Sequence, residues 1–125
     1  MIDLDFDKSG GLIPAIAQDY LTKEILMQAY INKEAWELTI KNNVAVYYSR
    51  SRKSLWKKGE TSGNVQKIKE IKVDCDLDSV IFLVEQIGDA ACHKGYRSCY
   101  YRSIKNNDLK ITGDLIFDPK VVYKK

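Results

Sequence analysis

Long apolar segments and prolines are scarce in this chain of 125 residues. No segment approaches the roughly 20 consecutive apolar residues that a membrane-spanning helix needs, so we expect no insertion in a membrane. Only two prolines occur, Pro14 and Pro119, one near each end. Internal repeats and low-complexity segments are also missing, and no composition change marks a domain boundary. We therefore predict one domain over residues 1–125.

The chain has three cysteines, Cys75, Cys92 and Cys99, too few for a disulfide framework and an odd number that cannot all pair. Buried thiols, a reactive thiol or a metal site remain open. The first residues are acidic, with no basic segment leading into an apolar one, so we expect no signal peptide and a cytoplasmic location. Disulfides are rare in that reducing compartment.

Strong charge of one sign is also missing, since the formal net charge is only +3. The cations are unevenly spread, however. Residues 50–72 are rich in Lys and Arg and contain only two carboxylates, Glu60 and Glu70. Such a stretch could bind phosphate groups, and it could equally be the solvated surface of strands and loops.

Apolar and β-branched runs predict strands, and one segment predicts a helix. Asn32 can cap a helix over 33–41, whose inward side would carry Ala35, Leu38 and Thr39, with Trp36 and Ile40 beside it. The polar residues 19–24 suit a hairpin connection. The predicted strands cover residues 12–18, 25–31, 44–48, 65–73, 80–87 and 99–104, with short apolar pieces at 109–111 and 115–117.

Three details refine this prediction. Pro14 places the first strand at a sheet edge or makes it begin at the proline. Residues 68, 71 and 73 break strict alternation, which predicts a bulge in that strand. The polar stretches 49–63 and 88–97 predict loops. A loop as long as 49–63 with little secondary structure is usually functional. The fold class is a β-rich α+β domain, a compact mixed or antiparallel sheet with one main helix.

Asp74, Asp76 and Asp78 alternate along the chain, so in an extended segment they project from one face while Cys75 points the other way. Crowded carboxylates repel one another unless a cation or protons intervene, and Mg²⁺ and Ca²⁺ prefer such oxygen ligands. An EF-hand is excluded because Ser79 stands where its loop needs glycine and no helices flank it. An acidic turn between two strands remains the alternative.

Cys92, His93 and Cys99 surround a glycine-bearing segment. The two thiols and the only imidazole of the chain could ligate zinc, with Cys75 as a third thiolate. Three thiolates leave a fourth position open, which marks a catalytic zinc site, and zinc acidifies the water that binds there. The alternative is that the cysteines are small buried apolar residues and the histidine is structural.

Residues 49–66 combine arginines, lysines, hydroxyls and glycines around Trp56. Arginine can bind phosphate through two parallel hydrogen bonds, and hydroxyls with loop N–H groups can complete such a site. Trp56 could stack on a base. The spacing matches neither a P-loop nor a dinucleotide fingerprint, so a mobile basic loop anchored by one tryptophan remains the alternative.

Taken together in their order, these segments resemble the phosphoribosyl-AMP cyclohydrolase family of histidine biosynthesis over residues 10–103. The resemblance rests on several ordered motifs. They are Gly-Leu-Ile-Pro-Ala-Ile-Ala-Gln-Asp (11–19), Tyr-Tyr-Ser-Arg-Ser-Arg (47–52), Leu-Trp-Lys-Lys-Gly-Glu-Thr-Ser-Gly (55–63), Val-Asp-Cys-Asp (73–76), Val-Glu-Gln (84–86), Ala-Ala-Cys-His (90–93) and Arg-Ser-Cys-Tyr-Tyr-Arg (97–102). The chain departs from the pattern at Tyr96, where many members carry arginine, at Lys23, commonly glycine, and at Asn64, histidine in some.

The resemblance implies an intertwined homodimer with a zinc site shared between subunits, ligated by Cys75, Cys92 and Cys99, and magnesium ligands at Asp74, Asp76 and Asp78. It implies hydrolytic cleavage of the N1–C6 bond of the adenine ring in phosphoribosyl-AMP. The product is an imidazole carboxamide with two phosphoribosyl arms. Many relatives carry a C-terminal pyrophosphohydrolase, for which this chain leaves no room, so we expect the stand-alone form.

Within that reaction, His93 is the candidate for proton transfer to N1. The predicted substrate-binding residues are Arg50, Arg52, Trp56, Lys57, Lys58, Thr61, Ser62 and Arg97. A structural zinc module that binds nucleic acid through the basic loop, with His93 as fourth ligand, is the alternative function, although the net charge is low for it. A cytidine-type deaminase is excluded because its His/Cys-x-Glu and Pro-Cys-x-x-Cys elements are missing.

Overall fold

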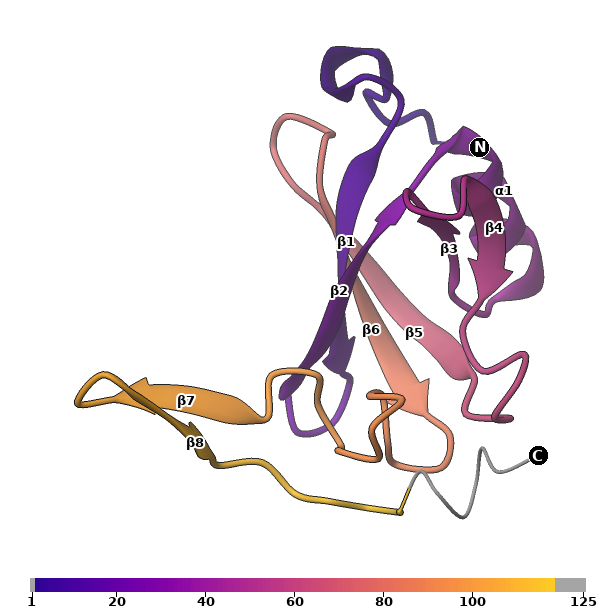
Figure 1. The fold of residues 1–125 in the computed structure, drawn as a ribbon. Helices are drawn as coiled ribbons and strands as arrows, with labels where there is room; N and C mark the ends of the chain where they lie inside the picture. The colour runs from indigo at the N-terminus through magenta and orange to yellow at the C-terminus, as the bar shows by residue number, and fades with distance from the viewer. Residues whose placement is uncertain (1, 119–125) are drawn as a thin grey trace.

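Six strands form a curled sheet that carries one helix on one side (Figure 1). The computed structural model describes residues 2–118, so Pro119 lies outside the described part. The sheet order is β4-β3-β2-β1-β6-β5, and a separate hairpin is made of β7 and β8. The elements are η1 (Asp7–Ser9), β1 (Ile13–Asp19), β2 (Ile25–Ile31), α1 (Lys33–Asn42), β3 (Val46–Ser49), β4 (Ser54–Lys57), β5 (Gln66–Val73), β6 (Val80–Gln86), β7 (Arg102–Lys105) and β8 (Asp108–Ile111).

The sheet is mixed, one of the two arrangements that the sequence predicts, because β1 runs parallel to β6 and all other neighbours are antiparallel. β5, at one edge, also bends round to the segment before β3. There Val44 bridges Lys67, and the Ala45 N–H donates to the Gln66 carbonyl at 3.0 Å. The sheet therefore curls almost closed around its apolar side chains, as a highly curved sheet must if it is to cover its own core.

β1 lies in the interior of the sheet, between β2 and β6, so the prediction of an edge strand is wrong. Its alternating pattern buries Ile13, Ala15, Ala17 and Asp19. The alternative, a strand beginning at the proline, is close to what is observed. Pro14 is the second residue of β1, and the parallel pairing with β6 starts only at Ala15, so the missing N–H costs the β1–β6 ladder nothing.

The helix follows the predicted signals. The Asn32 side chain accepts the Ala35 N–H at 2.8 Å, which satisfies one of the free donors of the first turn. Ala35, Trp36 and Thr39 are buried, and the Thr39 hydroxyl is bonded to both the N–H and the carbonyl of Val46 on β3. Ile40, which is expected beside this face, is 38% exposed, whereas Trp36 is buried.

Two predicted boundaries need correction. The expected loop 49–63 contains β4, which pairs with β3 through Tyr47 opposite Trp56. The expected strand 99–104 starts only at Arg102, because the residues before it are tied to β2: the Ser98 hydroxyl donates to Ile25, and the Cys99 N–H donates to Leu26 at 2.7 Å. The predicted bulge in β5 is confirmed between Ile68 and Glu70.

The β7–β8 hairpin extends away from the six-stranded sheet (Figure 1). Its apolar side chains Ile104, Leu109 and Ile111 are exposed, and Ile104 pairs across the strands with Leu109. An apolar hairpin of two strands with no sheet beneath it is marginally stable in water. Within residues 2–118 of one chain, this apolar surface is left exposed. Among residues 2–118, no helix is long and apolar enough to cross a membrane.

Candidate functional site

Two of the three cysteines lie together beyond the end of β6. Cys92 sits in a tight loop whose ends are joined by backbone bonds: its N–H donates to the Tyr96 carbonyl at 3.1 Å, and its carbonyl accepts from Gly95 at 2.9 Å. Gly95 has a φ of +92°, and a Cβ there would collide with the Phe117 carbonyl, so this turn requires glycine. Cys99 is fixed separately by its bond to Leu26. Two rigid backbone anchors therefore hold the two thiols close to each other.

A lysine accompanies the thiol pair. Burial raises the pKa of the Cys99 thiol to about 11, and the neighbouring Cys92 adds to the rise while the Lys58 charge opposes it. Burial lowers the pKa of the half-buried Lys58, and the two thiols act in the opposite direction. The three groups thus share one weakly solvated environment. A cation bound there would favour the thiolate forms, because opposite charge favours ionisation.

Cys75 does not join this pair within one chain. It is exposed in the turn between β5 and β6, at the top of Figure 1, whereas the loop of Cys92 follows β6 at the bottom. The seven residues of β6 alone span about 20 Å at roughly 3.3 Å per residue. Accordingly, no cluster of three potential metal ligands among residues 2–118 contains a cysteine. A site using all three thiols requires a second chain.

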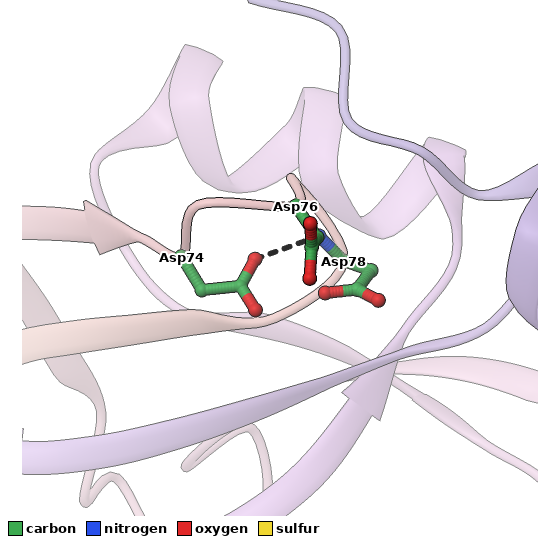
Figure 2. Close-up of side chains that lie close together, drawn as sticks. All are labelled: Asp74, Asp76 and Asp78. Carbon is green, nitrogen blue, oxygen red and sulfur yellow. Dashed lines mark hydrogen bonds between the residues drawn. The ribbon is translucent and has the colours of Figure 1, made fainter.

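The three aspartates do converge. One ligand oxygen from each of Asp74, Asp76 and Asp78 lies within 4.8 Å of the others (Figure 2). The expected extended geometry is wrong, because the segment is a turn in which Leu77 has a φ of +61° and the Asp78 N–H donates to Asp74 at 3.0 Å. That hydrogen bond is the largest influence lowering the pKa of the Asp74 carboxyl. Lys8 pairs with Asp78 at 3.1 Å and offsets part of the charge.

Three adjoining pockets surround Trp56, which lines all of them. The thiol pocket, about 330 Å³, is lined by Met27, Arg52, Trp56, Lys58, His93 and Cys99. The loop pocket, about 270 Å³, is lined by Arg52, Lys57, Lys58, Thr61, Ser62 and His93. The β3–β4 pocket, about 490 Å³, is lined by Tyr30, Tyr48, Ser49, Arg50, Ser51 and Trp56. Every predicted substrate-binding residue except Arg97 therefore lines one of them.

The loop that follows β4 has a defined shape. Gly59 has a φ of +89°, a Cβ there would meet the backbone of Asn64, and its carbonyl accepts the Gly63 N–H at 2.7 Å. The Asn64 side chain donates to the Ala90 carbonyl at 3.4 Å. This bond joins the loop to the segment that leads into Cys92. The loop that carries the pocket hydroxyls is therefore hydrogen-bonded to the segment that carries Cys92.

Arg97 lies outside the three pockets and is surrounded by carboxylates. Its guanidinium contacts Asp19 and Glu24 at 2.7 Å each and Asp89 at 3.5 Å. These ion pairs tie the loop of Cys92 to the β1–β2 turn. Its predicted role in substrate binding stays a prediction, and the contacts give it a clear part in holding the loop in place.

Because Asp19 pairs with Arg97, the free energy of unfolding should depend on pH in the acid range. Burial alone would raise the pKa of the Asp19 carboxyl, but N–H groups of Thr22 and Leu21 and the Arg97 charge outweigh it, and the net shift is downward. A carboxyl with a lowered folded-state pKa contributes stability above its unfolded value of about 3.9, and this contribution is lost as pH falls through the folded pKa.

We expect Asp19→Asn to reduce the free energy of unfolding at pH 7 by about 2–3 kcal/mol, as in other broken pairs with low exposure. Urea unfolding from pH 7 to pH 2.5 should show the difference from wild type shrinking below about pH 4. Glu37→Gln, which changes an exposed carboxylate on α1, is the control and should behave as wild type. A deficit that is the same at every pH would contradict the account.

A buried hydrogen-bond chain lies beneath the pockets, and the sequence analysis missed it. The Tyr47 hydroxyl donates to Gln66 at 2.7 Å, Gln66 donates to Gln86 at 2.9 Å, and Gln86 donates to the Asn64 carbonyl at 2.9 Å. Gln66 begins β5 and Gln86 ends β6, and both are buried, so their amides need partners inside the protein. The Tyr47 ring also packs against Trp56, with ring centroids 5.0 Å apart, so this buried hydrogen-bond chain supports the tryptophan that lines the pockets.

Two further residues were also missed. Met27 lines the thiol pocket, and the Tyr30 ring supports the Arg50 guanidinium at 4.2 Å. Both belong to β2, where only their apolar character was noted. Tyr96 is one of the positions where the chain departs from the family pattern. Its ring stacks on Tyr101 with a centroid distance of 3.8 Å, so an aromatic contact occupies this position.

Cations, hydroxyls, an aromatic ring and paired thiols around adjoining pockets are typical of an enzyme that acts on a phosphorylated small molecule. Comparison with known proteins specifies the family. A family model described as phosphoribosyl-AMP cyclohydrolase matches residues 27–101. The chain belongs to the phosphoribosyl-AMP cyclohydrolase family.

Individual relatives agree over the full length. A phosphoribosyl-AMP cyclohydrolase of Desulfatibacillum aliphaticivorans is 58% identical over 125 residues, which is 100% of both chains. Proteins of the same name from Desulforapulum autotrophicum and Methanosarcina acetivorans are 60% and 57% identical, covering 99% and 98% of this chain and 100% of each relative. The predicted family is thus confirmed, and nothing in these matches supports the nucleic-acid-binding alternative.

Proposed function

We propose that the protein hydrolyses the N1–C6 bond of the adenine ring of phosphoribosyl-AMP, a step of histidine biosynthesis, as a zinc-dependent homodimer. Membership of the cyclohydrolase family carries the proposal. The composition of the three pockets supports it, because they supply cations for phosphate, an aromatic ring for a base and an imidazole near the Cys99 thiol. The same family membership favours a biosynthetic enzyme of the cytoplasm, where free thiols such as these persist.

The reaction balances with one water molecule. Its oxygen adds to C6, the C6–N1 bond breaks, and a proton is delivered to N1, so that C6 becomes the carbonyl carbon of a carboxamide. His93 is exposed at the junction of the loop and thiol pockets, beside Cys92, which suits the delivery of that proton. Trp56 would hold the purine face, and the surrounding Arg and Lys side chains would hold the phosphates.

The residues present fit a zinc ion. Cys92 and Cys99 already lie together beside the thiol pocket and supply two soft sulfur ligands. Cys75 of a partner subunit would complete three soft ligands. Zinc, when bound, would supply Lewis acidity that ionises water near neutral pH. Lys58 beside the thiols offsets their negative charge, which would otherwise oppose that ionisation.

The residues also fit magnesium at the aspartates. Three carboxylates that converge within 4.8 Å offer the hard oxygen ligands that Mg²⁺ prefers. The turn of Asp74, Asp76 and Asp78 surrounds Cys75 in sequence, so an ion there would lie near the thiol that the partner subunit receives. Its part would be to add positive charge close to the reacting groups.

Two incomplete parts of one chain support the proposed homodimer. Cys75 cannot reach the thiol pair of its own chain, and the β7–β8 hairpin leaves Ile104, Leu109 and Ile111 exposed. A second copy that receives Cys75 and covers the hairpin would complete both. The symmetry of a two-fold dimer then gives two equivalent sites.

We expect the double substitution Ile104→Glu/Leu109→Lys to convert the dimer to a monomer at micromolar concentration. These residues face each other across the strands, so the new charges keep a favourable cross-strand pair while the apolar surface is lost. Size-exclusion chromatography with light scattering measures the mass. Ile40→Lys on the exposed side of α1 is the control and should stay dimeric; an unchanged dimer in the double variant would remove the hairpin from the interface.

Ultraviolet monitoring of purified protein with phosphoribosyl-AMP tests the function. Conversion of the purine to an imidazole should change the spectrum, chelation should stop it, and zinc and magnesium added back singly and together should define which ion is needed. Absence of any spectral change with the zinc-loaded protein would overturn the proposal. Salt-dependent binding of RNA without ring opening would favour the nucleic-acid alternative instead.

A further inference from the structure

Two of the pockets beside Trp56 have separate sets of groups that suit a phosphate. The β3–β4 pocket offers Arg50 with the hydroxyls of Ser49 and Ser51. The loop pocket offers Lys57 with the hydroxyls of Thr61 and Ser62. A substrate with a single phosphate would need one such set, whereas phosphoribosyl-AMP carries two phosphates on separate arms.

The Arg50 set is organised before any ligand binds. Its guanidinium lies over the Tyr30 ring at 4.2 Å, and such cation–π contacts restrict where the planar group points. The Ser49 hydroxyl accepts the Arg52 N–H at 3.2 Å and lies 3.4 Å from the Ser51 hydroxyl, which fixes the turn between β3 and β4. A fixed guanidinium beside fixed hydroxyls suits bidentate recognition of a phosphate.

The two pockets differ in their distance from the thiols. The loop pocket shares Arg52, Lys58 and His93 with the thiol pocket, in addition to Trp56. The β3–β4 pocket shares only Trp56 with the thiol pocket. The loop pocket is therefore next to the reacting groups, and the β3–β4 pocket lies across the tryptophan from them.

The substrate has the same asymmetry. N1 is bonded directly to C6, the carbon that water attacks, whereas N9 belongs to the five-membered ring on the far side of the purine. On the basis of the proposed function, we propose that the loop pocket holds the phosphate of the arm on N1 and the β3–β4 pocket, through Arg50, holds the phosphate of the arm on N9. The purine then lies along Trp56 with C6 toward the thiol pocket.

AMP is the direct probe, because it carries only the arm on N9. Calorimetric titration of the zinc-loaded protein with AMP should show affinity at least tenfold weaker in Arg50→Gln than in wild type. Lys57→Gln should keep its AMP affinity within twofold and raise the KM for phosphoribosyl-AMP at least tenfold. Lys33→Gln on α1 removes the same charge far from the pockets and should change neither quantity.

The outcomes separate this proposal from the function on which it rests. Weaker AMP binding in Lys57→Gln, with Arg50→Gln unaffected, would reverse the assignment and overturn the proposal. Equal losses in both variants, or no AMP binding to wild type, would overturn it as well. If wild type bound AMP through Arg50 yet failed to open phosphoribosyl-AMP, the proposed reaction would fall while the nucleotide subsite stood.

Discussion

Replacing any one of the three cysteines by serine should remove the bound zinc and reduce turnover by about a thousandfold or more. The reason is that each thiolate would supply one of only three protein ligands, and a serine hydroxyl is a poor ligand for zinc. Cys92 and Cys99 lie together in one chain, and Cys75 lies at the far end of β6. Metal analysis of the purified variants and the ultraviolet assay measure both effects.

Mixing two inactive variants makes this prediction specific. When Cys75→Ser and Cys92→Ser proteins are unfolded together and refolded, half of the dimers should be mixed, and each mixed dimer should contain one complete site. The mixture should therefore recover about one quarter of the wild-type activity. A mixture of Cys92→Ser and Cys99→Ser is the matched control, because both defects lie in the same half of the site. It should remain inactive.

Recovery in the control mixture, or none in the first mixture, would contradict a site shared in this way. Each substitution replaces one sulfur by oxygen and changes little volume, so the serine variants, including that of the buried Cys92, should keep their fold. Circular dichroism distinguishes loss of metal from loss of structure.

The second large effect is expected at His93. Its replacement by alanine should lower kcat by about 10²–10⁴-fold, the usual contribution of a positioned general acid. The zinc content should stay within about threefold of wild type and the KM should change far less than kcat, because the side chain is exposed and the proposed phosphate-binding cations Arg50 and Lys57 are kept. Added imidazole should restore part of the rate, since it can enter the space that the side chain leaves.

His93→Gln provides the comparison, because it keeps a polar side chain and cannot transfer a proton. It should be as slow as the alanine variant. If either variant kept near-normal turnover across the pH range, another group would deliver the proton and the role assigned to His93 would be withdrawn.

The sequence predicts most elements of this fold because their signals are local. Asn32 caps the helix that follows it, and alternation along 13–19 marks a strand with one buried face. The sequence does not predict β4, and the reason is physical. Its neighbours are polar and basic, and the strand exists because Trp56 packs on Tyr47 across the hairpin, a contact that no local pattern records.

The interior place of β1 illustrates the same limit. The rule that keeps proline out of central strands holds only where the missing N–H would have been used. Pro14 precedes the first residue that pairs with β6, so its missing N–H takes no bond from that ladder. Register with a strand more than 60 residues away decides this, and the sequence alone does not give it.

The candidate site could also be predicted only in part from the sequence. Convergence of the three aspartates was predicted from alternation in an extended segment, but it results from a turn with a positive φ at Leu77. The spacing of the cysteines gave no sign that Cys75 lies at one end of β6 and the other two thiols at the opposite end. Only the arrangement in space shows that one chain cannot bring them together.

Anomalous X-ray scattering at the zinc absorption edge, measured on crystals of the protein purified with zinc, tests the shared site most directly. We predict one strong peak per chain, bonded to Cys92 and Cys99 of one subunit and to Cys75 of the partner subunit, at Zn–S distances of about 2.3 Å. A peak held only by groups of one chain, or crystals of active protein with no peak at the thiols, would contradict the account.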